Sequence, residues 1–136
     1  MTNLRRRYPN TRSDAGQAFV EFALVLPILC VLLFGIIQFG ITYNNYVTIT
    51  DAARAGARKG AVSRNLGAPS ASSATENQVR SSASDLDQSK LEVTVTSGWN
   101  PGDDLNVKAS YPYDINLLGF VVASGKVSST TTERVE

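Results

Sequence analysis

The chain has no histidine and only one cysteine, Cys30, among its 136 residues. Without histidine, the sequence excludes Ser-His-Asp and Cys-His catalysis, histidine metal sites and a histidine pH switch. A lone cysteine cannot form an intrachain disulfide or a cysteine-rich zinc site. The close carboxylates Asp103 and Asp104 follow Gly102, where Asp is expected as a turn residue. We therefore predict that the protein is not an enzyme and needs no cofactor or metal ion.

Charged residues are scarce, at 18% of the chain, and they are divided unequally by sign. Residues 1–65 hold eight Lys and Arg against three Asp and Glu, whereas residues 66–136 hold five against nine. A chain that is basic in one half and acidic in the other is expected to meet two environments. No nucleic-acid partner is expected, because the C-terminal half is net negative and the basic leader precedes an apolar segment.

One long segment is almost free of charge. Between Ala15 and Thr50 the only charged residue is Glu21, and the run from Phe22 to Ile37 contains no polar side chain. A hydrocarbon core of ~30 Å takes about 20 apolar residues at ~1.5 Å each. The run exceeds the ~7–15 apolar residues of a secretory signal. We predict a single membrane-spanning helix in contact with lipid, and leader arginines that hold the N-terminus in the cytoplasm and place the C-terminal part outside.

The helical pattern continues beyond the apolar run and becomes amphipathic. Small side chains recur at three- and four-residue spacing, which lets another helix or a sheet approach closely. The helix-packing residues of this stripe are Ala53, Gly56, Ala57 and Gly60. One helix from about Gln17 to about Arg64 is predicted, with Pro27 as the candidate kink and Gly67 near the C-terminal cap.

The region after this helix changes character twice. Residues 68–75 are small and polar and are expected to form a loop, with Thr75 capping a short amphipathic helix. Apolar and polar side chains then alternate over residues 91–96 and 105–111, which predicts two strands of an antiparallel hairpin. Pro112 is expected to end the second strand. Residues 117–122 are read as an apolar segment in a long connection, and residues 127–135 as a third strand.

These elements define an α+β fold class. A long N-terminal membrane-spanning helix continues into an amphipathic helix, and a small antiparallel β-sheet head follows. The predicted boundaries are a basic cytoplasmic leader at 1–16, the helix at 17–65, a polar linker with a short helix at 66–90, and the head at 91–136. About 70 residues bury little core alone, so the head is expected to dock on the helix or on a partner.

The junction between leader and helix holds the candidate functional residues. Gly16 ends the leader, the apolar helix starts at once, and Glu21 is the fifth residue after that glycine. A charged Asp, Lys or Arg costs roughly 2.5–3.5 kcal/mol at mid-bilayer on insertion scales, and less near the interface. Glu21 is therefore either a functional carboxylate, whose natural partner is a new amino terminus at Gln17, or an acid that suits the positive end of the helix dipole.

Three blocks carry a resemblance to a known family. They are Gly16-Gln-Ala-Phe-Val-Glu21-Phe-Ala-Leu-Val-Leu-Pro27, Phe34-Gly-Ile-Ile-Gln-Phe-Gly40 and Ala52-Ala-Arg-Ala-Gly-Ala-Arg58. Together they resemble the TadE-like pseudopilins, or minor pilins, of Flp/Tad-type (tight-adherence) pilus assembly systems. Phe22 stands where major Flp pilins often carry tyrosine, and the chain is much longer than those subunits. Both departures favour the accessory role over the bulk filament subunit.

The resemblance implies a bacterial inner-membrane protein of the type IV pilin class that takes part in biogenesis of a surface pilus. It implies prepilin-peptidase cleavage between Gly16 and Gln17, and it makes Glu21 the assembly carboxylate near the mature N-terminus. The implied partners are the prepilin peptidase, other pilin or pseudopilin subunits and the Tad assembly machinery. The alternative is a single-pass, membrane-anchored binding module outside the cytoplasm, with no leader processing.

Overall fold

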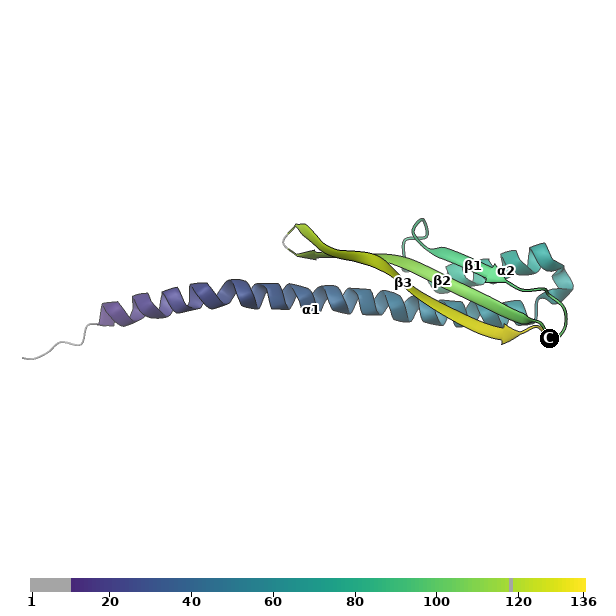
Figure 1. The fold of residues 1–136 in the computed structure, drawn as a ribbon, viewed down its shortest axis with the longest axis horizontal. Coiled ribbons are helices and arrows are strands. Elements are labelled where there is room, and N and C mark those ends of the chain that lie inside the picture. The colour runs from purple at the N-terminus through teal and green to yellow at the C-terminus, as the bar shows by residue number, and fades with distance from the viewer. Residues whose placement is uncertain (1–10, 118) are drawn as a thin grey trace, which may run out of the picture.

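The computed structural model describes residues 11–117 and 119–136. The described chain begins with a long helix and a short 3₁₀ turn, α1 (Thr11–Ala61) and η1 (Arg64–Leu66), and continues with α2 (Ala68–Ser82). Three antiparallel strands follow in the sheet order β1-β2-β3, namely β1 (Glu92–Thr96), β2 (Asp104–Leu117) and β3 (Phe120–Arg134). In Figure 1, α2 and the sheet gather around the C-terminal half of α1, and the N-terminal half projects alone. The predicted α+β class is confirmed.

Helix α1 is unbroken through Pro27 and extends beyond the predicted start. It begins at Thr11 rather than near Gln17, and no proline or glycine stands between Thr11 and Gly16 to stop it. The first ten residues of the predicted leader lie outside the described residues. At the other end α1 stops at Ala61, and Gly67, with φ of 81°, precedes α2 instead of capping α1.

The loop predicted for residues 68–75 is wrong, because α2 already begins at Ala68. Pro69 lies in its first turn, where the missing N–H costs nothing. Ala71, Thr75 and Val79 recur every four residues and are fully buried. Thr75 is thus no cap. Its hydroxyl donates to the carbonyl of Ala71 at 2.8 Å, which satisfies it inside the helix.

The predicted β1–β2 hairpin is confirmed, with Val93 opposite Ala109 and Val95 opposite Val107. The predicted end of β2 at Pro112 is wrong, since the strand continues to Leu117. Pairing with β1 already ends at Ser110, so Pro112 has a neighbour on one side only, opposite Lys126 of β3. A residue without an N–H donor is tolerated where one side of the strand has no partner.

The long connection predicted around residues 117–122 is a tight hairpin instead. Leu117 pairs with Phe120, and Gly119 adopts a φ of 92° that favours glycine. The predicted third strand is confirmed and is longer than expected, because β3 starts at Phe120 and lies on the edge of the sheet. A register shift at Ile115/Asn116 marks a bulge near the tip.

The core of the head lies where α1, α2 and the sheet meet. Apart from Ile49, α1 contributes small side chains, and larger ones come from α2 and β2. Its fully buried members are Ile49, Ala52, Ala53, Ala57, Val79, Ala83, Leu105, Val107 and Ala109. The predicted docking of the head on the long helix is therefore observed within one chain.

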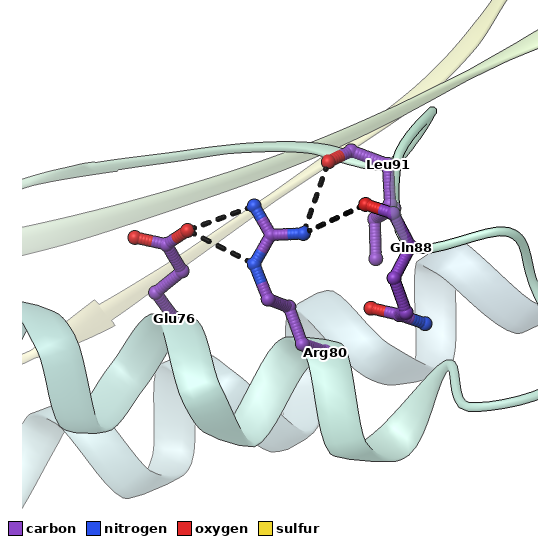
Figure 2. A network of polar contacts seen from close by, with 4 residues as sticks. All are labelled: Glu76, Arg80, Gln88 and Leu91. Carbon is purple, nitrogen blue, oxygen red and sulfur yellow. Dashed lines mark hydrogen bonds and ion pairs between the residues drawn. The ribbon is translucent and has the colours of Figure 1, made fainter.

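Arg80 fastens the connection between α2 and β1 (Figure 2). Its Nε and Nη2 atoms donate to Glu76 Oε1 at 3.0 and 2.9 Å. Its Nη1 donates to the carbonyl oxygens of Gln88 at 3.2 Å and Leu91 at 3.3 Å. One guanidinium thus holds the connection between α2 and β1 in place through four hydrogen bonds.

Candidate membrane-spanning and assembly segment

The N-terminal half of α1 is bare on all sides in the described structure. Side chains around the helix are exposed, for example Phe19 at 72%, Ile28 at 70% and Phe39 at 69%. Within the described residues, α1 is the one helix long and apolar enough to cross a membrane, and none of its most apolar window is buried. Residues 18–41 span about 36 Å at ~1.5 Å per residue, which suffices for a bilayer core. The segment has the properties of a single-pass membrane anchor.

The candidate cleavage junction lies inside this helix. Gly16 and Gln17 are both helical and exposed, and no atom lies within 4 Å of the position a Cβ would take at Gly16. Gln17 Nε2 donates to Glu21 Oε1 at 3.1 Å across one helical turn. The structure thus brings Gln17 and Glu21 into contact on an exposed face, at the start of the apolar run.

An aromatic group marks the C-terminal end of the apolar run. Phe39 and Tyr43 are stacked, with ring centroids 6.3 Å apart and planes inclined by 17°. Tyr43 and Tyr46 are exposed, as expected for side chains at a membrane–water interface. Close by, α1 and β2 enclose a cleft of about 250 Å³ with polar and aromatic walls. Its lining comprises Gln38, Ile41, Thr42, Asn45, Lys90 and residues 111–114.

The small-residue stripe of α1 faces the head of the same chain. Ala53 and Ala57 are fully buried. A Cβ at Gly56 would collide with Val79 and lie 3.2 Å from the carbonyl oxygen of Thr75. A Cβ at Gly60 would lie 2.5 Å from Leu105 Cδ2 and 2.6 Å from Thr75 Oγ1. At Gly56 and Gly60 the stripe therefore packs against α2 and β2 at a distance that leaves no room for a Cβ.

Sequence reasoning missed α2 as the element that covers the stripe. The available signal was the four-residue spacing of Ala71, Thr75 and Val79, which is a helical period. Asp103 has a turn role, because its Oδ2 accepts from the backbone N and the Nδ2 of Asn100 at 3.0 and 2.9 Å. Asp104 instead begins β2, and its Oδ1 lies 3.8 Å from Arg134 Nε. Among the described residues, no three His, Cys, Asp or Glu side chains gather as a metal site would require.

Comparison with family models finds a match in the N-terminal part of the chain. The family model of TadE-like proteins matches residues 16–58, which run from the glycine of the junction through the apolar span to Arg58. No curated protein and no solved structure matches the chain. The matched segment contains Gly16, Glu21 and most of the small-residue stripe, so the resemblance predicted from the sequence is confirmed. By this match, residues 16–58 of the chain are similar to the TadE-like proteins.

Proposed function

We propose that the protein is a pseudopilin-like structural subunit that takes part in biogenesis of a Tad-type pilus. The TadE-like match suggests a pilus-related, non-enzymatic protein. The observation that carries the finer proposal is the junction Gly16-x₄-Glu21 at the start of a helix whose N-terminal half is bare while its C-terminal half carries the head. Such a helix suits lipid before assembly and the helices of neighbouring subunits afterwards.

In this proposal a prepilin peptidase cuts between Gly16 and Gln17. The junction is exposed and glycine offers no side chain to obstruct the approach of an enzyme, which supports cleavage there. The new amino group would then belong to Gln17, whose side chain already contacts Glu21. An ammonium near this carboxylate, from the same or a neighbouring subunit, would reduce the cost of placing a charge at the edge of the membrane.

We place the protein in a bacterial inner membrane, with the N-terminus inside and the head outside. The basic residues of the leader support this orientation by the positive-inside rule. The proposed partners are the peptidase, other pilin-like subunits and the Tad assembly machinery. A membrane-anchored binding module is the alternative, and it differs because it requires no cut at Gly16.

Intact-mass analysis of the membrane-extracted protein tests the cleavage. In cells with the matching peptidase, the native chain should begin at Gln17, Gly16→Ala should still be cut, and Gly16→Phe should insert but remain uncut. A native chain that still begins at Met1 would refute the proposal and favour the binding module.

Filament recovery tests the role of Glu21. Glu21→Gln should be processed normally but yield fewer pili, because the pairing charge is lost, and Glu21→Asp should restore part of the yield. Glu133→Gln, which removes an exposed carboxylate from the head, serves as the matched control. Normal pili from the Glu21→Gln strain would refute the assembly role. Glu21 would then be only an acid that suits the positive end of the helix dipole.

A further inference from the structure

The tip of the β2–β3 hairpin is an exposed apolar end in an otherwise polar head. Phe120, Val121 and Val122 are exposed at 76%, 59% and 56%. The sequence carries no charged residue from Ile115 to Gly125. Figure 1 shows this hairpin running back along α1, away from the rest of the head and toward the bare half of the helix.

Two contacts fix the level of the tip along α1. Leu105, near the start of β2, lies against Gly60, and residues 111–114 share a cleft with residues of α1 between Gln38 and Asn45. From Asp114 to Leu117 the strand advances by about 10 Å, which corresponds to about seven residues of α1. The tip therefore stands beside residues numbered roughly 31–38, within the apolar run.

The side chains along the hairpin change in the order expected for a path from water into lipid. At the base, Arg134 and Asp104 form an exposed ion pair at 3.8 Å. Lys126, opposite Pro112, pairs with Glu92 at 2.6 Å at the level of the cleft. Tyr111 and Tyr113 line the same cleft, at the level of residues 38–45 of α1, the range that includes Phe39 and Tyr43, as in an interfacial aromatic belt. Beyond Asp114 only uncharged side chains remain, and those at the end are apolar.

We propose that the β2–β3 tip enters the outer leaflet of the same membrane that α1 crosses, as a second, shallow membrane contact. This inference rests on the proposed membrane span of α1. The cross-strand pairs Leu117↔Phe120 and Asn116↔Val121 keep the strands together to the end of the hairpin. The outer edges of β2 and β3 keep unpaired backbone groups, so the tip stays in the outer ~5–10 Å, where water still reaches the backbone.

The contact would fix how the head sits on the membrane. A single helix lets a head rotate and tilt freely, whereas a helix and a hairpin tip are two points of attachment on one rigid unit.

The competing occupant of the tip is the apolar helix of a second copy of this chain. The two are distinguished by whether lipid or protein surrounds Phe120.

Quenching by brominated lipids tests the proposal on the full chain in nanodiscs that hold one copy each. The native protein has one tryptophan, Trp99, in the turn before β2 at the opposite end of the sheet, which should not be quenched. In a Trp99→Phe background, Phe120→Trp provides the tip probe and Phe34→Trp provides the probe in α1. Bromine on the upper acyl chain should lower the emission of both probes about twofold, as expected for interfacial insertion.

The outcomes separate this inference from the proposed function. Quenching at position 34 without quenching at position 120 would overturn the tip contact and leave the membrane span intact. Loss of quenching at both positions would overturn the span as well. The tryptophan at position 120 could also become shielded from water only when two copies share a disc. That result would show that a second chain covers the tip, and it would overturn the proposal.

A charge at the tip provides a second test. Adding Val121→Asp to the chain with the probe at position 120 should abolish most of the quenching, because a carboxylate resists entry into lipid. Thr130→Asp, at an exposed position of β3 far from the tip, should leave the quenching unchanged. Equal quenching in both variants would contradict insertion.

Discussion

Replacing Gly56 with alanine tests whether α1 and α2 pack at backbone contact distance. The new Cβ would collide with Val79 Cγ2 and lie 3.2 Å from the carbonyl oxygen of Thr75. A helical valine has one strongly preferred rotamer, so Val79 cannot turn away cheaply. Overpacking typically costs about 1–3 kcal/mol, while alanine gains up to about 1 kcal/mol over glycine in a helix. Because Val79 cannot move, we take the upper part of the overpacking range, about 2–3 kcal/mol, and subtract the gain of alanine. We therefore expect Gly56→Ala to lower the free energy of unfolding of the head by about 1–2 kcal/mol.

Thermal unfolding of the full chain in detergent measures this loss, with Trp99 fluorescence as the probe. Trp99 packs partly buried against the core of the head, whereas the apolar half of α1 lies elsewhere. For a unit of about 60–100 residues, 1 kcal/mol shifts the melting temperature by about 4–8 °C. Gly40→Ala is the matched control, because no atom lies within 4 Å of a Cβ at that position.

A double variant separates the collision from other effects of the substitution. Adding Val79→Ala to Gly56→Ala removes the colliding methyl groups, so the two changes should cost less together than the sum of their separate losses. Contacting residues typically show coupling of about 0.5–3 kcal/mol. A Gly56→Ala chain that melts at or above the native temperature would show that the two helices have room to spare, and the packing described for the stripe would be wrong.

Two further predictions concern the connection between α2 and β1. Arg80→Gln should lower the free energy of unfolding by about 1–2 kcal/mol, because it removes bonds to Glu76 and to two carbonyls, whereas Arg54→Gln should change it by less than about 0.5 kcal/mol. Equal melting temperatures would refute the role of Arg80. Hydrogen bonds from Ser89 lower the pKa of Asp87 from 3.8. A group with a lowered folded pKa stabilises the fold above its unfolded pKa, and this contribution disappears as pH falls through the folded pKa. The melting temperature of Asp87→Asn should therefore fall less than that of the native chain as pH decreases below about 4. An equal fall in both chains would contradict this prediction.

Elements with a strong period could be predicted from the sequence alone. The apolar run of α1 is long and uninterrupted, and the alternation over residues 91–96 and 105–111 leaves only one face for the core. The proposal for the junction at Gly16 and Glu21 likewise depends only on local sequence. These features need no knowledge of what lies nearby in space.

The elements that were missed depend on tertiary contacts. Residues 68–75 contain mostly Ser, Ala and Thr, and their helical state is fixed by burial of Ala71 and Thr75 against α1. Pro112 normally ends a strand, but here β1 has already ended and β3 continues alongside. The level of the hairpin tip along α1 follows from strand lengths and from the packing of Leu105, neither of which a local pattern contains.

The size of the side chains along α1 explains how one helix serves two environments. Before Tyr46 its faces carry bulky Leu, Ile, Val and Phe, which fill space against fluid lipid chains. From Ile49 onward the inward face carries Ala and Gly, which allow α2 and β2 to approach the backbone. The TadE-like match crosses this boundary, since it runs from residue 16 to residue 58. The matched segment therefore contains both the apolar half of α1 and most of the small-residue surface on which α2 and β2 pack.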